Sequence, residues 1–158
     1  MSQHVISVNV ENKPGVLARV AGLFSARGYN IDSLAVSTTE NKDISVMSIV
    51  VNGDDRIIEQ VKKQLNKLID VIKVSEHSKT PSIQRELSLI KVHINPSKRG
   101  EIFELCEIFK AEIADISSKS VTLGVKGSPD KIDKIIELLR PYGIKEMIRS
   151  GRLSMLRE

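Results

Sequence analysis

Residues 5–31 read VISVNVENKPGVLARVAGLFSARGYNI, and this stretch decides the fold of the first half of the chain. Over residues 5–10 apolar and polar side chains alternate, which is typical of a β-strand with one buried face. Pro14-Gly15 interrupts this pattern. Apolar residues then recur at helical spacing until Gly28, a residue type that commonly ends helices. The stretch therefore predicts a strand, a turn, a helix and the start of a second strand at Ile31.

The same pattern extends outward from this stretch. The periodicity predicts strands over 31–38, 44–51 and 71–75, with a second amphipathic helix over 55–69. The resulting order, βαββαβ, is that of a ferredoxin-like unit of about 75 residues.

The pattern starts again after a polar segment with a central proline, Pro81. We interpret residues 78–85 as a linker. A second βαββαβ pattern follows, with strands over 87–94, 113–117, 120–125 and 144–148 and helices over 102–109 and 129–139. The sequence therefore predicts an α+β chain of two tandem ferredoxin-like units, a first domain over 1–77 and a second over 86–158.

The strand predicted over 31–38 would lie at the edge of its sheet in this topology. It contains one charged residue, Asp32, and no proline or lysine. It therefore lacks the usual protection against pairing with another strand. We expect it to pair with a copy of itself in a two-fold homodimer.

Composition excludes several classes of protein. No apolar run approaches the roughly 18 residues of a membrane span, and the N-terminus does not resemble a signal peptide, so a cytoplasmic location is expected. The net charge is +4 without a dense basic patch, and aromatic residues make up 3% of the chain. Neither feature favours nucleic-acid binding. The lone cysteine, Cys106, has helical spacing to apolar neighbours and is interpreted as a buried apolar residue.

The usual catalytic arrangements are absent from the sequence. His4, His77 and His93 are scattered and have no metal-ligand spacing with each other or with Cys106. No phosphate-binding loop, nucleophile motif or dinucleotide-binding glycine pattern occurs. We therefore predict no catalytic residues and no metal site on this chain.

Two loops of the first unit remain as candidates for a ligand site. Taken singly, a Pro-Gly turn before a helix and a glycine after it have ordinary structural explanations. Gly15, however, leaves the backbone N–H groups of a helix start open to a carboxylate. Asn30 offers an amide to an ammonium or a carboxylate, and Leu17 and Ile31 could line an aliphatic side chain. Together these features predict a site for a small α-amino acid.

The two loops and their surroundings resemble a known family. Asn12-Lys-Pro-Gly-Val-Leu17 followed by Gly22-Leu-Phe-Ser-Ala-Arg-Gly-Tyr-Asn-Ile31 is similar to an ACT domain, and more closely to the small, regulatory subunit of acetohydroxyacid synthase (acetolactate synthase). The segments at 58–71 and 85–92 and Arg149-Ser-Gly151 agree with this family. The resemblance spans nearly the whole chain, although the tail, residues 153–158, is less typical.

The resemblance implies a function in a two-subunit enzyme. A separate catalytic subunit would hold thiamine diphosphate, magnesium and FAD and would condense pyruvate with a second 2-oxo acid, toward valine, leucine and isoleucine. The small subunit would bind no cofactor, raise this activity and confer feedback inhibition, usually by valine. The effector site would lie where two ACT domains meet. The matching positions here are Asn12, Gly15, Val16, Leu17, Asn30 and Ile31.

The second unit lacks both loops, so we expect one ligand-site contribution per chain and a structural or partner-docking role for the second unit. Two other functions agree with parts of the sequence. A free-standing tandem ACT regulator of gene expression would share the loops, but the family-like segments beyond residue 58 disfavour it. An RNA-binding ferredoxin-like domain would carry aromatic residues on its strands, and none occurs there.

Overall fold

The computed structural model describes residues 2–158 and divides into two compact units. The first unit runs to Ile83 and also includes Gly151–Glu158, and the second is Gln84–Ser150. The sequence-based division assigned the last residues to the second domain. In the structure they return to the first unit, because they form hydrogen bonds to it that no local sequence pattern encodes.

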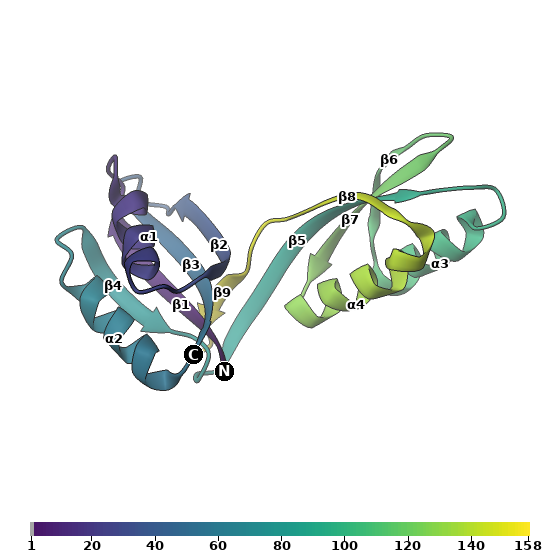
Figure 1. Cartoon of the computed structure of the whole chain (residues 1–158). Coiled ribbons are helices and arrows are strands. Elements are labelled where there is room, and N and C mark those ends of the chain that lie inside the picture. Colours follow the sequence, from purple (N-terminus) through teal and green to yellow (C-terminus); the bar gives the residue numbers. More distant parts are fainter. Residues whose placement is uncertain (1) are drawn as a thin grey trace. The chain divides into compact units, whose positions relative to one another are not determined.

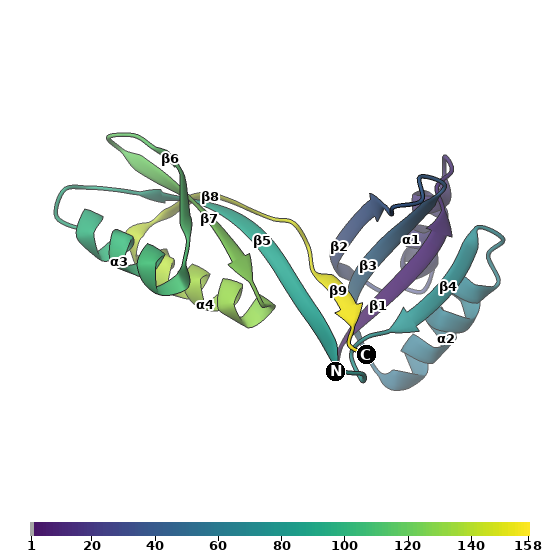
Figure 2. The same cartoon turned by 180° about the vertical axis from the view of Figure 1, so that it is seen from behind.

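The first unit has the predicted βαββαβ order (Figure 1). Its four strands pair antiparallel in the order β2-β3-β1-β4, so β2 lies at an edge, as predicted. Both helices cover the same face of this sheet (Figure 2). The elements are β1 (Ser2–Glu11), α1 (Val16–Ala26), β2 (Ile31–Thr38), β3 (Ile44–Gly53), α2 (Asp55–Asn66) and β4 (Val71–Glu76).

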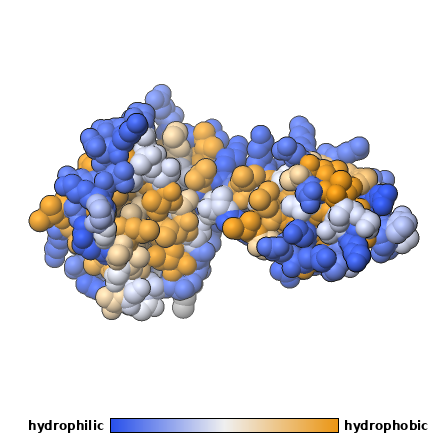
Figure 3. Space-filling view, turned by 90° about the horizontal axis from the view of Figure 1, so that it is seen from above, coloured by the Kyte–Doolittle hydropathy of each residue, from blue (hydrophilic) through white to orange (hydrophobic). Residues whose placement is uncertain are grey.

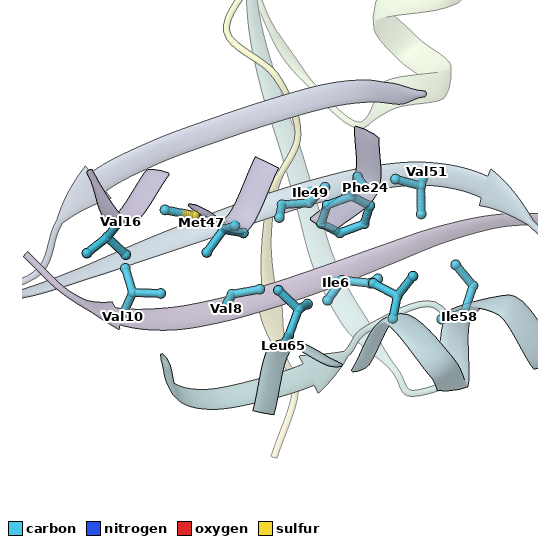
Figure 4. Packing of buried hydrophobic residues seen from close by; sticks show 12 residues of the cluster. Ile6, Val8, Val10, Val16, Phe24, Met47, Ile49, Val51, Ile58 and Leu65 are labelled. Atoms are coloured by element: carbon cyan, nitrogen blue, oxygen red, sulfur yellow. The ribbon is translucent and has the colours of Figure 1, made fainter. Parts of the chain in front are cut away.

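The core of the first unit lies between the sheet and the two helices. Alternate residues of β1 and β3 point toward the helices, and one apolar stripe of each helix points back (Figure 4). Burial of this apolar surface is the main favourable contribution to folding. The fully packed residues are Ile6, Val8, Val10, Val16, Val20, Phe24, Met47, Ile49, Val51, Ile58, Val61 and Leu65.

The second unit repeats the architecture with strand order β6-β7-β5-β8. Its α4 begins with Ser128, whose hydroxyl accepts the Lys131 N–H, followed by Pro129. Together the two units confirm the predicted fold class. The elements are β5 (Ser82–His93), α3 (Arg99–Phe109), β6 (Glu112–Ile116), β7 (Ser120–Gly127), α4 (Pro129–Leu139), the 3-10 turn η1 (Arg140–Tyr142) and β8 (Ile144–Arg149).

Cys106 lies in the core of the second unit, as its spacing predicted. Burial raises the pKa of its thiol, which keeps it protonated and unreactive. Among the described residues, no helix is long and apolar enough to cross a membrane.

The segment interpreted as a linker is partly strand. β5 begins at Ser82, within the residues predicted to be irregular. A last strand, β9 (Leu153–Leu156), pairs with β5, and the Arg157 N–H donates to the Pro81 carbonyl at 2.9 Å. The C-terminal residues therefore supply the hydrogen bonds that extend β5 into the polar segment.

Candidate amino-acid-binding site

The start of α1 has the open character expected of an anion site. Gly15 is its N-cap residue, with φ 84°, and no side chain caps this end of the helix. The first turn contains no acidic residue. The N–H groups of a first helical turn have no partner within the helix, and the helix dipole favours an anion there.

A cation that the sequence analysis missed lies over this loop. Nε and Nη2 of Arg19 donate to Oδ2 of Asp70 at 3.0 and 2.5 Å. A Cβ built on Gly15 would lie 3.0 Å from Nη1 of Arg19. Asp70 balances the charge of the guanidinium, and Nη1 is the nitrogen that lies beside the helix start. Asp70 is far away in sequence, so no local motif indicated this pair.

Asn12 joins this loop to the turn between β2 and β3. Its Nδ2 donates to the Lys42 carbonyl at 2.9 Å, and its backbone N–H donates to the Asp43 carbonyl at 2.8 Å. Within residues 2–158, Oδ1 of Asn12 has no hydrogen-bond donor. Asn12 thus has a structural role and still presents one acceptor.

The apolar candidates differ in what they can offer a ligand. Val16 is 3% exposed and packs in the core, so its backbone is the part that could face a ligand. Leu17 is 45% exposed beside it. Ile31, the first residue of β2, is half-buried against the same core. Leu17 is therefore the one candidate of the three with a substantially free side chain.

Asn30 lies in the second loop, after the end of α1. Its Nδ2 donates to Oδ1 of Asp32 at 3.0 Å. The other oxygen of Asp32 accepts a hydrogen bond from Nδ2 of Asn52, on β3. This arrangement orients the Asn30 amide so that its oxygen faces away from Asp32. The sequence analysis did not identify Asp32 or Asn52, whose contact depends on the pairing of β2 with β3.

One chain does not bring the two loops together. Gly15 precedes α1 and Asn30 follows it, and an 11-residue helix is about 16 Å long. A ligand of amino-acid size cannot span that distance. Within one chain, the two candidate loops therefore cannot hold the same ligand of this size.

The surface beside these loops is open to another chain. β2 has a free edge, and its side chains Leu34 and Val36 are exposed. On α1, Ala18, Gly22 and Ser25 are exposed at helical spacing, and no atom lies within 4 Å of a Cβ built on Gly22. Small side chains allow another helix to approach closely.

The other polar clusters have structural explanations. Nδ1 of His4 lies 2.8 Å from Oε1 of Glu76 in a buried pair. Burial alone would raise the pKa of Glu76, but hydrogen bonds from His4 and Ser78 and the charge of Lys62 lower it overall. Residues 2–158 contain no group of three or more His, Cys, Asp or Glu side chains that could hold a metal ion.

The matching position in the second unit is differently built. At the start of α3 the Asn95 side chain accepts the Lys98 N–H at 3.0 Å and the Ser97 hydroxyl at 2.7 Å. Lys98 also lies 3.5 Å from Glu101. No side chain caps α3 either, but Lys98 takes the N-cap position that Gly15 has in α1, and Glu101 adds a negative charge to the first turn.

Comparisons with known proteins cover both units. A family model described as an AHAS small subunit-like ACT domain matches residues 6–73, and one described as the small subunit of acetolactate synthase matches residues 85–158. The probable acetolactate synthase small subunit of Archaeoglobus fulgidus is 59% identical over 155 residues, which is 98% of this chain and 97% of that protein.

Two further relatives agree with these matches. The acetolactate synthase small subunit of Mycolicibacterium smegmatis is 51% identical over 98% of this chain and 91% of its own length. The crystal structure of the small subunit from Thermotoga maritima aligns with a TM-score of 0.90 at 38% identity, over 100% of this chain and 99% of that one.

Proposed function

This chain belongs to the acetolactate synthase small-subunit family, and we propose that it activates a catalytic subunit of acetolactate synthase and makes it sensitive to feedback inhibition by valine. The first unit would bind the effector and form the homodimer. The catalytic subunit would hold the thiamine diphosphate, magnesium and FAD of the reaction.

The observation that carries the effector site is the separation of its two halves along α1, beside a free strand edge. A two-fold axis that pairs β2 with β2 of a second copy would lay the two α1 helices side by side and antiparallel. The start of one α1 would then face the end of the other. The Gly15 loop of one chain would meet the Asn30 loop of its partner.

The chemistry of the two halves suits a zwitterion with an aliphatic side chain. The effector carboxylate would accept hydrogen bonds from the backbone N–H groups at the start of α1, beside Nη1 of Arg19. Its ammonium would donate to Oδ1 of Asn12 and to the Asn30 amide oxygen of the partner. Leu17 and Ile31 would contact the branched side chain. Valine fits this set of groups.

The test combines the purified chain with its catalytic subunit, pyruvate, thiamine diphosphate, magnesium and FAD. We expect the chain alone to form no acetolactate, the mixture to exceed the catalytic subunit alone, and valine to reverse that gain. Turnover by the chain alone would contradict the non-catalytic role. Absence of any effect on the catalytic subunit would favour the free-standing amino-acid-sensing regulator instead.

A further inference from the structure

The last residues of the chain cross the sheet of the first unit on the face opposite the helices (Figure 2). The Arg152 N–H donates to the Ser33 hydroxyl on β2 at 2.9 Å, and its Nη1 donates to Oε1 of Gln3 on β1 at 2.9 Å. Beyond the end of β4, Nδ1 of His77 lies 2.7 Å from the Ser154 hydroxyl. The segment therefore has contacts from one edge of the sheet to the other.

The contact with β2 requires glycine at position 151. Gly151 is buried and has φ 87°, a conformation that side-chain-bearing residues rarely adopt. A Cβ there would lie 2.9 Å from the Leu34 carbonyl oxygen and 3.2 Å from Oγ of Ser33. Because the nearest atom belongs to the backbone of β2, no side-chain rotation could relieve that clash. At Gly151 the backbone of the C-terminal segment thus contacts the backbone of β2.

This segment covers side chains that an open sheet face would expose. Val5 and Val50 are neighbours across β1 and β3 and point away from the helix-facing core, yet they are 2% and 1% exposed. Ser33, which binds the segment, is paired with Val50. The segment lies on this face of the sheet, together with the start of β5 that pairs with it.

In the second unit, the equivalent face of the sheet is not covered by a C-terminal segment. Leu89 and Ile148 are paired across β5 and β8 on the face away from α3 and α4. They are 42% and 66% exposed, and Leu87 on the same side of β5 is 51% exposed. Figure 3 shows orange side chains on the surface of this unit among blue ones. Apolar side chains on this face are thus buried in the first unit, where the C-terminal segment lies, and exposed in the second unit.

We propose that Gly151–Glu158 is a strap that holds the edge strand β2 in place, with Gly151 and Ser33 as its positioning residues. β2 begins at Ile31, and Asp32, which binds Asn30, is the neighbour of Ser33 along the strand. A strap that fixes Ser33 therefore also fixes the loop that presents Asn30. This second step rests on the effector site proposed above.

The strap also links the end of the second unit to β2, by the peptide chain as far as Gly151 and by noncovalent contacts from there. Residues 84–150 lie between Ile83 and Gly151 in the chain, so the strap begins where the second unit ends. Movement of the end of the second unit would therefore displace Gly151 and Arg152, which contact Leu34 and Ser33 on β2. The strap is thus a route by which the second unit can change the effector loop.

The experiment replaces Gly151 by valine in the full chain. The Cβ clash and the unfavourable φ should detach the strap from β2. Losing one hydrogen bond and its packing should speed hydrogen exchange of the β2 amides about tenfold and weaken valine binding by a similar factor. Exchange in α2 should stay unchanged. Exchange is followed by mass spectrometry and valine affinity by calorimetry.

The matched control is Gly143→Val. Gly143 also has a positive φ, 92°, and a Cβ there would lie 2.9 Å from the His93 ring, but it does not touch β2. This variant should leave exchange in β2 as in the parent. Deletion of residues 151–158 is a second variant that removes the strap altogether. It should also speed exchange in β2, and it provides the test if the Gly151→Val protein does not fold.

Three results separate the claims. Unchanged exchange in β2 on deletion of 151–158 would overturn the strap. Faster exchange with unchanged valine affinity would overturn the positioning of the effector loop. Faster exchange in the variants, together with a parent protein that does not bind valine, would support the strap and refute the proposed effector site.

Discussion

At the residue scale, the proposed site depends on Gly15. Its φ of 84° lies in the left-handed region that glycine adopts without steric strain. The space where a side chain would begin is occupied at 3.0 Å by Nη1 of Arg19. The position therefore selects glycine by conformation. The half-exposed Arg19 side chain would move aside where an effector carboxylate reaches the helix start.

Changing Gly15 to aspartate should remove the response to valine. The new carboxylate would lie near Arg19 and the helix start, where it would take the place of the effector carboxylate and repel it. Aspartate tolerates positive φ better than most residues, so folding should survive. A loss of about 3 kcal/mol would weaken valine binding roughly a hundredfold. Titration calorimetry measures this, beside circular dichroism.

Gly100→Asp is the control for that change. Gly100 lies in the first turn of α3 in the second unit, with open space around it. It should bind and respond to valine like the parent. A Gly15→Asp protein that is folded and still inhibited by valine would place the effector site elsewhere.

Asn30→Ala should act in the same direction with a smaller effect. The substitution removes one amide that the effector could bind, and a hydrogen bond to a charged group contributes about 1.5–3 kcal/mol. Valine affinity should fall by at least about tenfold. Activation of the catalytic subunit should persist, because Asn30 lies in the loop proposed for the effector. Unchanged affinity would exclude the second loop from the site.

At the scale of elements, β2 is the part of the first unit proposed to join two chains. It is an edge strand with exposed Leu34 and Val36 and lies beside the small exposed residues of α1. In a two-fold antiparallel pair of β2 strands, the first half of one strand would lie opposite the second half of the other. Both halves of the effector site therefore depend on this one contact.

Val36→Lys should weaken the dimer. The substitution puts a charge in place of an exposed apolar side chain on each copy of β2, and charged residues on edge strands oppose pairing. Ultracentrifugation at micromolar concentration should show a shift toward monomer, and valine binding should fall with it. Ile113→Lys on β6, the edge strand of the second unit, has similar starting exposure, 44% against 42%, and should leave the dimer intact. A dimeric Val36→Lys protein would contradict pairing through β2.

The helices and strands were predictable from sequence because apolar periodicity is local. Alternation in β1 and β3 and the stripes of α1 and α2 each lie within a few residues, and the core follows from them. The contacts of Arg19 with Asp70 and of Asp32 with Asn52 join segments distant in sequence. Periodicity does not indicate such pairs, which explains why the sequence predicts the two candidate loops but not the residues that contact them.

At the scale of the whole molecule, the first unit is assembled from both ends of the chain. Gly151 was recognised in the sequence only as part of a family-like segment, although its positive φ and its contact with β2 make it a structural requirement. The sequence placed a boundary near Pro81, where the chain leaves the first sheet. The sequence does not indicate that residues 151–158 return to the first unit. Eight residues that lie on the face of a distant sheet need no periodic pattern of apolar side chains.

This return predicts the behaviour of the isolated first unit. A fragment of residues 1–83 would expose Val5 and Val50, and burying an apolar side chain of this size contributes about 1.5–3 kcal/mol. A second fragment would replace residues 84–150 by ten glycine and serine residues, which span about 17 Å on average, and keep residues 151–158. Urea unfolding should show the second fragment to be more stable than the first by about 2 kcal/mol.

Gly151→Val in the second fragment should abolish that gain, because the clash with Leu34 detaches the segment from β2. Equal stability of the two fragments would mean that the C-terminal residues rest on the sheet without stabilising it.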